Sequence, residues 1–159
     1  MGEGAGTATI ADRLDHVSIA TRRIASLVPL IRDVLGARFL MGATESGQGF
    51  RWAQFQFAGG GVLELIEPLD EKGSVQDFLE RRGEGLHHIT LRVRDIAART
   101  RELEALGYQP FRAKLDNPVW KEVFLHPRET HGVLIQLAES ELPYGREVEY
   151  YQQLELDDL

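Results

Sequence analysis

The feature that most constrains the fold of this chain is an internal duplication. Placing His16 on His88 aligns Val17–Ile19 with Ile89–Leu91 and brings the segments GVLELI and GVLIQL together. Glu64 and Gln136 then coincide, because each lies 48 residues after its histidine. A repeat of about 72 residues indicates two copies of one supersecondary unit, related by a pseudo-twofold axis.

Each copy has the pattern of a strand, a helix and further strands. Residues 16–20 alternate between apolar and polar, and residues 24–36 carry apolar side chains at helical spacing, with Pro29 inside and Gly36 at the end. The runs that start at Gly49 and Gly61 alternate again, which is typical of strands. The second copy repeats this order, and SVQDFLERRG between the copies predicts a short helix with Ser74 as its N-cap.

These patterns predict an α+β fold of two βαβββ modules in tandem, whose curved, mostly antiparallel sheet surrounds a metal cleft. The expected parts are a flexible N-terminus at 1–13, a first module at 14–70, a linker with a short helix at 71–85, a second module at 86–138 and an acidic C-terminal tail at 139–159.

Four polar residues stand at equivalent points of the two copies. Successive side chains of a strand face opposite ways, so each of these residues opposes apolar neighbours that a helix would cover. One such residue would ordinarily face water, but together the four offer the nitrogen and oxygen donors that suit a divalent cation. The predicted metal ligands are His16, Glu64, His88 and Gln136.

Neighbours of these ligands are candidates for substrate contact. Ser18 and Thr90 share the faces of the two histidines, and Trp52 lies on the polar face of its own strand. We therefore expect Ser18, Thr90 and Trp52 to bind a substrate. His87 points away from His88 in an ideal strand, so packing or hydrogen bonding is the better interpretation of this residue.

Composition narrows the class of protein. The sequence has no cysteine, which excludes disulfides and thiolate ligands and fits a reducing cytoplasm. Residues 139–159 hold seven acids against Arg146, so most of the net charge of −7 lies there, and nucleic-acid binding by a basic surface is disfavoured. No stretch approaches the roughly 18 apolar residues of a membrane span. We expect a cytoplasmic protein that binds a small molecule and neither nucleic acid nor membrane.

The sequence resembles the vicinal oxygen chelate superfamily, which includes glyoxalase I, extradiol dioxygenases, resistance proteins and methylmalonyl-CoA epimerase. The resemblance covers residues 14–138 and is closest to the epimerase branch. Its motifs here are LDHVSIA, LGA, ELIEPL, SVQDFLERRGEGLHHI, FLHP and GVLIQL. It implies paired βαβββ modules, one divalent metal ion (Co, Zn, Ni, Mn or Fe) on the concave face, and a homodimer.

Two positions depart from the epimerase pattern. The resemblance implies glutamates at the last ligand position and shortly after LGA, where our alignment places Gln136 and Met41. Neither a carboxamide nor a thioether serves as a base at neutral pH. The pseudo-symmetry allows glutamine and glutamate to exchange places, so Glu64 becomes the predicted catalytic carboxylate as well as a ligand. Glu45 is a possible second base.

The leading hypothesis is a metal-dependent isomerase or epimerase that acts on the α-proton of an acyl-CoA-like or α-carbonyl substrate. A glyoxalase I-type lactoylglutathione lyase would use the same ligands. Two histidines and one carboxylate also suit an Fe(II) dioxygenase. A noncatalytic protein that sequesters a ligand in the cleft is the remaining alternative.

Overall fold

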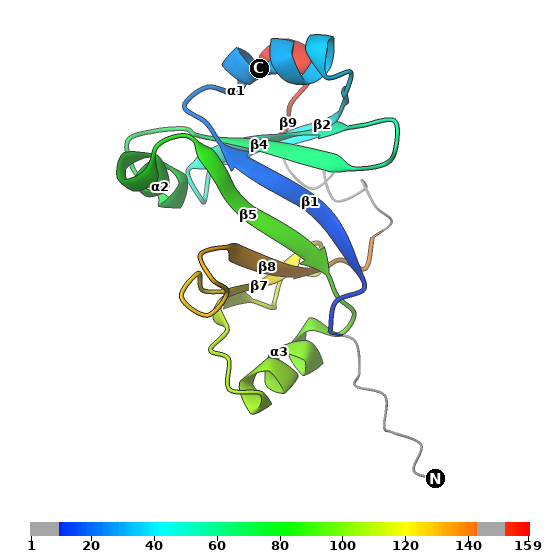
Figure 1. Ribbon diagram of the computed structural model, residues 1–159, viewed down its shortest axis with the longest axis vertical. Helices are drawn as coiled ribbons and strands as arrows, with labels where there is room; N and C mark the ends of the chain where they lie inside the picture. Colours follow the sequence, from blue (N-terminus) through cyan, green and yellow to red (C-terminus); the bar gives the residue numbers. More distant parts are fainter. Residues whose placement is uncertain (1–9, 143–151) are drawn as a thin grey trace.

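The computed structural model describes residues 10–142 and 152–159. In this part of the chain, strands form the centre of the molecule and short helices flank it (Figure 1). No helix among these residues is long and apolar enough to cross a membrane. The strands are β1 (Arg13–Ala20), β2 (Arg38–Glu45), β3 (Phe50–Gln56), β4 (Val62–Pro68), β5 (Gly85–Arg92), β6 (Phe111–Lys114), β7 (Lys121–Leu125), β8 (Leu134–Glu139) and β9 (Gln152–Gln153). The helical segments are α1 (Ile24–Val28), η1 (Pro29–Val34), α2 (Ser74–Arg82), α3 (Ile96–Ala105) and η3 (Leu156–Asp158).

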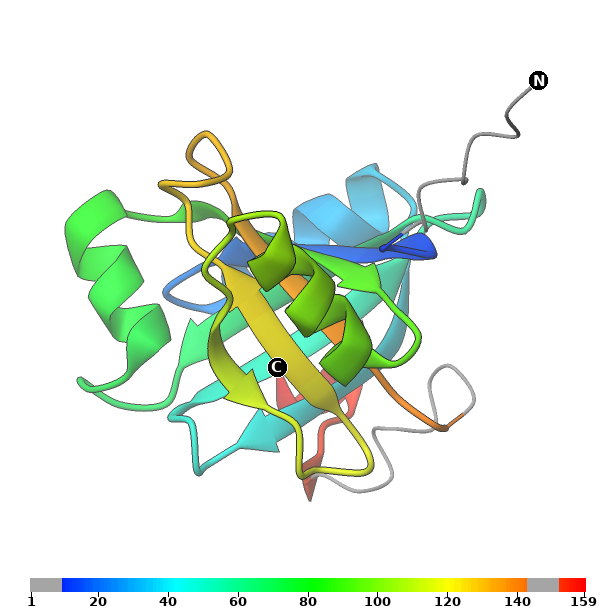
Figure 2. The same ribbon diagram turned by 90° about the horizontal axis from the view of Figure 1, so that it is seen from below.

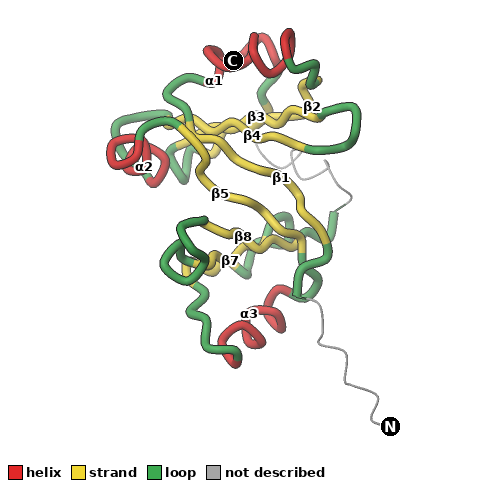
Figure 3. The backbone as a smooth tube through the Cα atoms, in the orientation of Figure 1, coloured by secondary structure: helices red, strands yellow, loops and turns green. Residues whose placement is uncertain are grey.

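One sheet in the order β6-β7-β8-β5-β1-β4-β3-β2-β9 joins all the described strands. The first strand of each module pairs in parallel with the last, β1 with β4 and β5 with β8, and every other pair is antiparallel. The sheet curves so that its two halves face each other across β1 and β5 (Figures 1 and 3). The predicted α+β fold of two βαβββ modules is confirmed.

The pairing of the strands relates equivalent residues of the two modules. Where β1 meets β5, His16 pairs with Thr90 and Ser18 pairs with His88. In the repeat, His16 is equivalent to His88 and Ser18 is equivalent to Thr90, so a pseudo-twofold axis between the strands relates one pair to the other. In the parallel pairs, Ser18 lies beside Glu64 in the same way that Thr90 lies beside Gln136. The register therefore brings both halves of the predicted ligand set to the middle of the sheet.

The outer face of each module is covered by its own helix. The segment α1–η1 packs on Ala53, Phe55 and Leu65 of the first module, and α3 packs on the second (Figures 1 and 2). The apolar cluster beside α3 in the second module includes Val123, Leu125 and Leu137. By strand pairing, these three residues are the counterparts of Ala53, Phe55 and Leu65. Covering the apolar faces from outside leaves the polar faces of both modules directed inward.

Pro29 changes the helix in which it lies. The α-helical segment ends at Val28, and the chain continues in wider turns in which the N–H of Leu35 donates to the carbonyl of Leu30. Proline has no N–H to donate, which accounts for the break in the α-helical pattern at this point. The helix α2 begins at Ser74 as predicted, although Gly73 is its N-cap and no side chain caps it.

The C-terminal segment returns to the first module. β9 pairs with the edge strand β2, and Leu156 and Leu159 pack against the cluster of apolar residues beneath α1. The predicted acidic tail therefore includes a segment, 152–159, that pairs with β2 and packs on the first module. Residues 1–9 of the predicted flexible N-terminus and residues 143–151 of the tail lie outside the described residues.

Candidate metal centre

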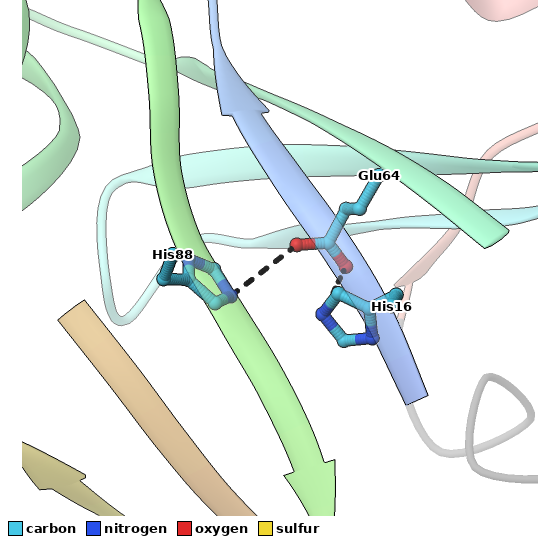
Figure 4. A group of neighbouring side chains, drawn as sticks. All are labelled: His16, Glu64 and His88. Carbon is cyan, nitrogen blue, oxygen red and sulfur yellow. Dashed lines mark ion pairs between the residues drawn. The ribbon is translucent and has the colours of Figure 1, made fainter. Parts of the chain in front are cut away.

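Three of the four predicted ligands form one cluster. Ligand atoms of His16, Glu64 and His88 all lie within 4.8 Å of one another, and all three residues are buried (Figure 4). The Nε2 atom of His16 is 3.5 Å from one Glu64 oxygen, and the Nε2 atom of His88 is 3.9 Å from the other. The side chains come from β1, β4 and β5, the strands that the register places side by side.

Gln136 reaches the same cluster through Thr90. The Thr90 hydroxyl lies 3.0 Å from His16 Nε2 and donates to Gln136 Oε1 at 2.6 Å. The amide nitrogen of Gln136 donates in the opposite direction, to Glu122 Oε2 at 2.6 Å. The Gln136 oxygen, the only atom of this side chain that could bind a cation, therefore faces the histidine side.

Glu64 is held by donors on both oxygens. Ser18 Oγ donates to Oε1 at 3.0 Å, and Gln54 Nε2 donates to Oε2 at 3.0 Å. Our sequence reasoning missed Gln54, which lies opposite Glu64 on the neighbouring strand. Its own carbonyl oxygen is buried without a hydrogen-bond partner. An acceptor left in this state beside the cluster is a further oxygen donor that a cation could use.

The ionisable groups of the cluster form a buried ion pair. Burial alone would lower the pKa of His16, but the charge of Glu64 and the hydrogen bond with Asp15 raise it to about 9. Burial alone would raise the pKa of Glu64, but His16, with smaller effects of His88 and Gln54, lowers it to about 2. Burial lowers the pKa of His88 to about 3, so this ring is neutral.

Each histidine of the cluster is oriented by the residue before it. Asp15 Oδ1 lies 2.8 Å from His16 Nδ1, and its other oxygen accepts from Arg92 Nε at 3.0 Å. His87 Nδ1 lies 2.8 Å from His88 Nδ1, so hydrogen bonding by His87 is confirmed, but the expectation that it points away from His88 was wrong. In both cases the Nδ1 atom is occupied, which leaves Nε2 to face the cluster.

The three predicted substrate contacts have different surroundings. Ser18 and Thr90 are completely buried, and neither lines the cavity. The register sets each hydroxyl beside a predicted ligand. Ser18 therefore donates a hydrogen bond to Glu64, and Thr90 donates one to Gln136. Trp52 does line the cavity, next to Ile66 on β4.

A cavity of about 870 Å³ opens between the two halves of the sheet, and the four predicted ligands form part of its wall. This volume is typical of a small-molecule site. The wall also includes Glu45 at the end of β2 and Glu122 on β7. Burial, with a smaller effect of the Glu122 charge, raises the pKa of Glu45. Arginines that line the cavity are Arg81, Arg82, Arg92, Arg112 and Arg128.

The cluster fits a divalent cation. Two imidazoles, one carboxylate and one carboxamide oxygen match the donors that borderline divalent ions bind. Metal bonds of about 2.0–2.2 Å in a tetrahedral site set ligand atoms roughly 3.4 Å apart. Glu64 lies 3.5 and 3.9 Å from the two histidine nitrogens, which is close to that spacing. In the metal-free protein a proton on His16 balances the charge of Glu64, and a cation would replace that proton.

Known proteins resemble this chain in sequence and in fold. Residues 15–121 match the model of the Glyoxalase/Bleomycin resistance protein/Dioxygenase superfamily. The uncharacterized protein YqjC of Bacillus subtilis is 39% identical over 133 residues, which cover 80% of this chain and 92% of that protein. The ethylmalonyl-CoA/methylmalonyl-CoA epimerase of Cereibacter sphaeroides is 34% identical over 134 residues, 80% of this chain and 97% of that enzyme. The crystal structure of methylmalonyl-CoA epimerase from Mycobacterium tuberculosis superposes with a TM-score of 0.77 at 29% identity, covering 86% of this chain and 93% of that one.

Proposed function

The chain belongs to the glyoxalase/bleomycin resistance protein/dioxygenase superfamily, and from this membership we propose that it is a divalent-metal-dependent epimerase or isomerase. Its substrate is an acyl-CoA-like or other α-carbonyl compound, and the reaction moves the proton on the α-carbon. The ligand cluster in the wall of a cavity of about 870 Å³ is the observation that carries this proposal.

In this proposal His16, Glu64, His88 and Gln136 hold one divalent ion. When bound, the ion supplies positive charge that polarises the substrate oxygens and makes the α-proton more acidic. The residues of the chain do the rest. Glu64 accepts the α-proton, while Ser18 and Gln54 fix the direction of its two oxygens.

The charge around the cavity supports an anionic substrate such as an acyl-CoA. Arg81 and Arg82 end α2 beside the cavity, and Arg112 and Arg128 line it from the second module. Guanidinium groups bind phosphate oxygens through two parallel hydrogen bonds. Two of the relatives described above are enzymes named for acyl-CoA substrates.

The proposal also includes a cytoplasmic homodimer. The cysteine-free sequence supports the reducing compartment, and the family resemblance supports the dimer. Light scattering on the purified protein measures the assembly directly. A mass near 17.9 kDa at micromolar concentration would contradict the dimer.

A second candidate function rests on the composition of the cluster. Two histidines and one carboxylate form the ligand set of non-haem Fe(II) oxygenases. Oxygen consumption by the Fe(II)-loaded protein with a catechol would favour this function over the epimerase. Lactoylglutathione formation from methylglyoxal and glutathione would in the same way favour a glyoxalase.

The test of the leading proposal combines metal analysis with proton exchange. Protein purified without chelators or an affinity tag is analysed for metal and incubated with methylmalonyl-CoA in deuterated water. We expect one metal ion per chain and incorporation of deuterium at the α-carbon. Stoichiometric metal without exchange would move the assignment to a glyoxalase or an oxygenase, and absence of metal would favour a ligand-sequestering protein.

Three variants define the roles in this assay. His88→Ala should lose metal and exchange together, because it removes a ligand. Glu64→Gln should keep measurable metal binding and lose proton transfer, and retained turnover in this variant would refute Glu64 as the base. Glu104→Gln is the matched control, since Glu104 is exposed on α3 and does not line the cavity.

A further inference from the structure

Inversion at an α-carbon requires proton transfer on two faces. The proton leaves from one face and a new proton arrives at the other, so one carboxylate on one side does not complete the reaction. The carboxamide of Gln136, on the second module, neither accepts nor donates such a proton at neutral pH. If Glu64 serves the first face, as in the proposed function on which this inference rests, the second module must supply another group.

The register of the sheet points to one position on that module. On β3, Trp52 pairs with Ile66, which lies 50 residues after His16. On β7, Glu122 pairs with Ala138, which lies 50 residues after His88. Glu122 is therefore the pseudo-symmetric counterpart of Trp52, a residue that lines the cavity beside the ligands.

Glu122 is bound to the ligand set of the second module. It lines the cavity, yet only 7% of its surface is exposed. One carboxylate oxygen accepts from Gln136 Nε2 at 2.6 Å, and the other lies 3.1 Å from Lys114 Nζ. These two contacts fix the carboxylate next to a predicted ligand and on the module opposite Glu64.

The other carboxylates of the cavity are less suited to this role. Asp15 lies on β1, in the same module as Glu64, and its oxygens contact His16 and Arg92. Glu45 lies at the end of β2 on the same module as Glu64, and Asp77 is exposed on α2. Of the described carboxylates that line the cavity, Glu122 alone is buried on the second module.

We propose that Glu122 is the second proton-transfer residue of this site, acting on the face of the substrate opposite Glu64. Glu64 accepts the α-proton, and the C–H electron pair becomes the enolate. Glu122 then donates a proton to the other face of the same carbon, and the roles reverse for the other epimer. Exchange of both carboxyl groups with water restores the starting state, so no further reactant is needed.

This placement also accounts for the distribution of glutamines and glutamates. The first module carries Glu64 at its ligand position with Trp52 on the adjacent strand, and the second carries Gln136 with Glu122 on the adjacent strand. Each module thus supplies one carboxylate, as a reaction on two faces requires. The proton-transfer pair is divided between the repeats, although only one member is a predicted ligand.

The test separates exchange from inversion. Each epimer of methylmalonyl-CoA is incubated with metal-loaded protein in deuterated water, and both α-deuterium and configuration are measured. We expect Glu122→Gln to lose inversion by at least about 100-fold. For the epimer that presents its proton to Glu64, exchange with retention of configuration should stay within about tenfold of the wild-type rate. Glu45→Gln and the exposed Glu104→Gln are compared under the same conditions.

Chemical rescue provides an independent readout if Glu122→Gln folds poorly. Glu122→Ala leaves space in the cavity wall, and added formate should restore inversion in proportion to its concentration. Absence of rescue in a folded, metal-loaded Glu122→Ala protein would overturn the assignment. Inversion by Glu122→Gln at the wild-type rate, or loss of inversion in Glu45→Gln alone, would overturn it too. Wild-type protein that exchanges no α-proton would instead refute the proposed function, and with it this inference.

Discussion

Metal binding to this protein should tighten steeply as the pH rises from 7 to 9. In the metal-free protein the pKa of His16 stands at about 9, because Glu64 and Asp15 favour the protonated ring despite burial. A protonated imidazole has no lone pair at Nε2 for a cation, so metal must displace that proton. His88, with its pKa lowered to about 3, is already neutral and adds no pH dependence in this range.

The size of the effect follows from the pKa of His16. At pH 7, about one molecule in 100 has His16 deprotonated, so the apparent affinity should be about 100-fold weaker than at alkaline pH. This difference corresponds to about 2.7 kcal/mol, at 1.36 kcal/mol for each pH unit. Because metal binding releases a proton, the apparent affinity rises with pH. It should increase about tenfold for each pH unit up to pH 9 and then level off.

Isothermal titration calorimetry with Mn²⁺ measures both parts of this prediction. Titrations at pH 7 in buffers of different ionisation enthalpy should show about one proton released for each ion bound, and a series from pH 7 to 9 gives the slope. His88→Ala is the control for loss of the site itself. An affinity that stays constant from pH 7 to 9, with no proton released, would refute the assigned protonation of His16.

Four further results are expected. Asp15→Asn keeps the hydrogen bond but removes the charge beside His16, and it should weaken metal binding at pH 9 by about 10–100-fold in a competition titration. Arg81→Glu should raise the KM for an acyl-CoA without changing kcat, and an unchanged KM would exclude it from substrate binding. Phe55→Ala empties a fully buried position and should lower the free energy of unfolding by about 3–5 kcal/mol in urea. Deleting residues 152–159 uncovers the edge of β2 and should lower the thermal midpoint by several degrees.

The sequence predicted that His16, Glu64 and His88 would lie together because two regularities acted together. Alternation along a strand assigned His16 and His88 to polar faces, and the repeat set Glu64 and Gln136 at equal distances from them. Neither regularity depends on which strands are neighbours. The same two facts gave the two modules and the approximate bounds of most elements, since helix and strand periods differ clearly in this chain.

Residues that act across strands could not be predicted in this way. Gln54 and Glu122 stand on polar faces, but their partners depend on the pairing of β3 with β4 and of β7 with β8. Ser18 and Thr90 were placed on the correct faces and were expected to contact substrate. The parallel pairs bury both hydroxyls behind ligand side chains, a consequence of register that alternation does not reveal.

Asp15 and His87 contact the histidines that follow them because the alternation of the strand is broken at both residues. In a regular strand each would face away from the histidine that follows it. Where β1 meets β5, the register shifts between Leu14 and His16 and again opposite His87, so both residues lie at bulges. Each bulge lets the side chain contact Nδ1 of the following histidine.

The two bulges are equivalent in the repeat, but their side chains differ in charge. The carboxylate of Asp15 helps to hold a proton on His16, whereas the neutral ring of His87 does nothing comparable for His88. If the two histidines bind metal as proposed, we therefore expect His16 alone to lose a proton. Exchanging the two orienting residues, in an Asp15→His, His87→Asp double variant, should move the proton from His16 to His88. The pair of histidines should still carry one such proton in total. NMR titration of the two imidazoles would detect this transfer, and a proton that stays on His16 would show that Glu64, rather than the bulge residue, decides its place.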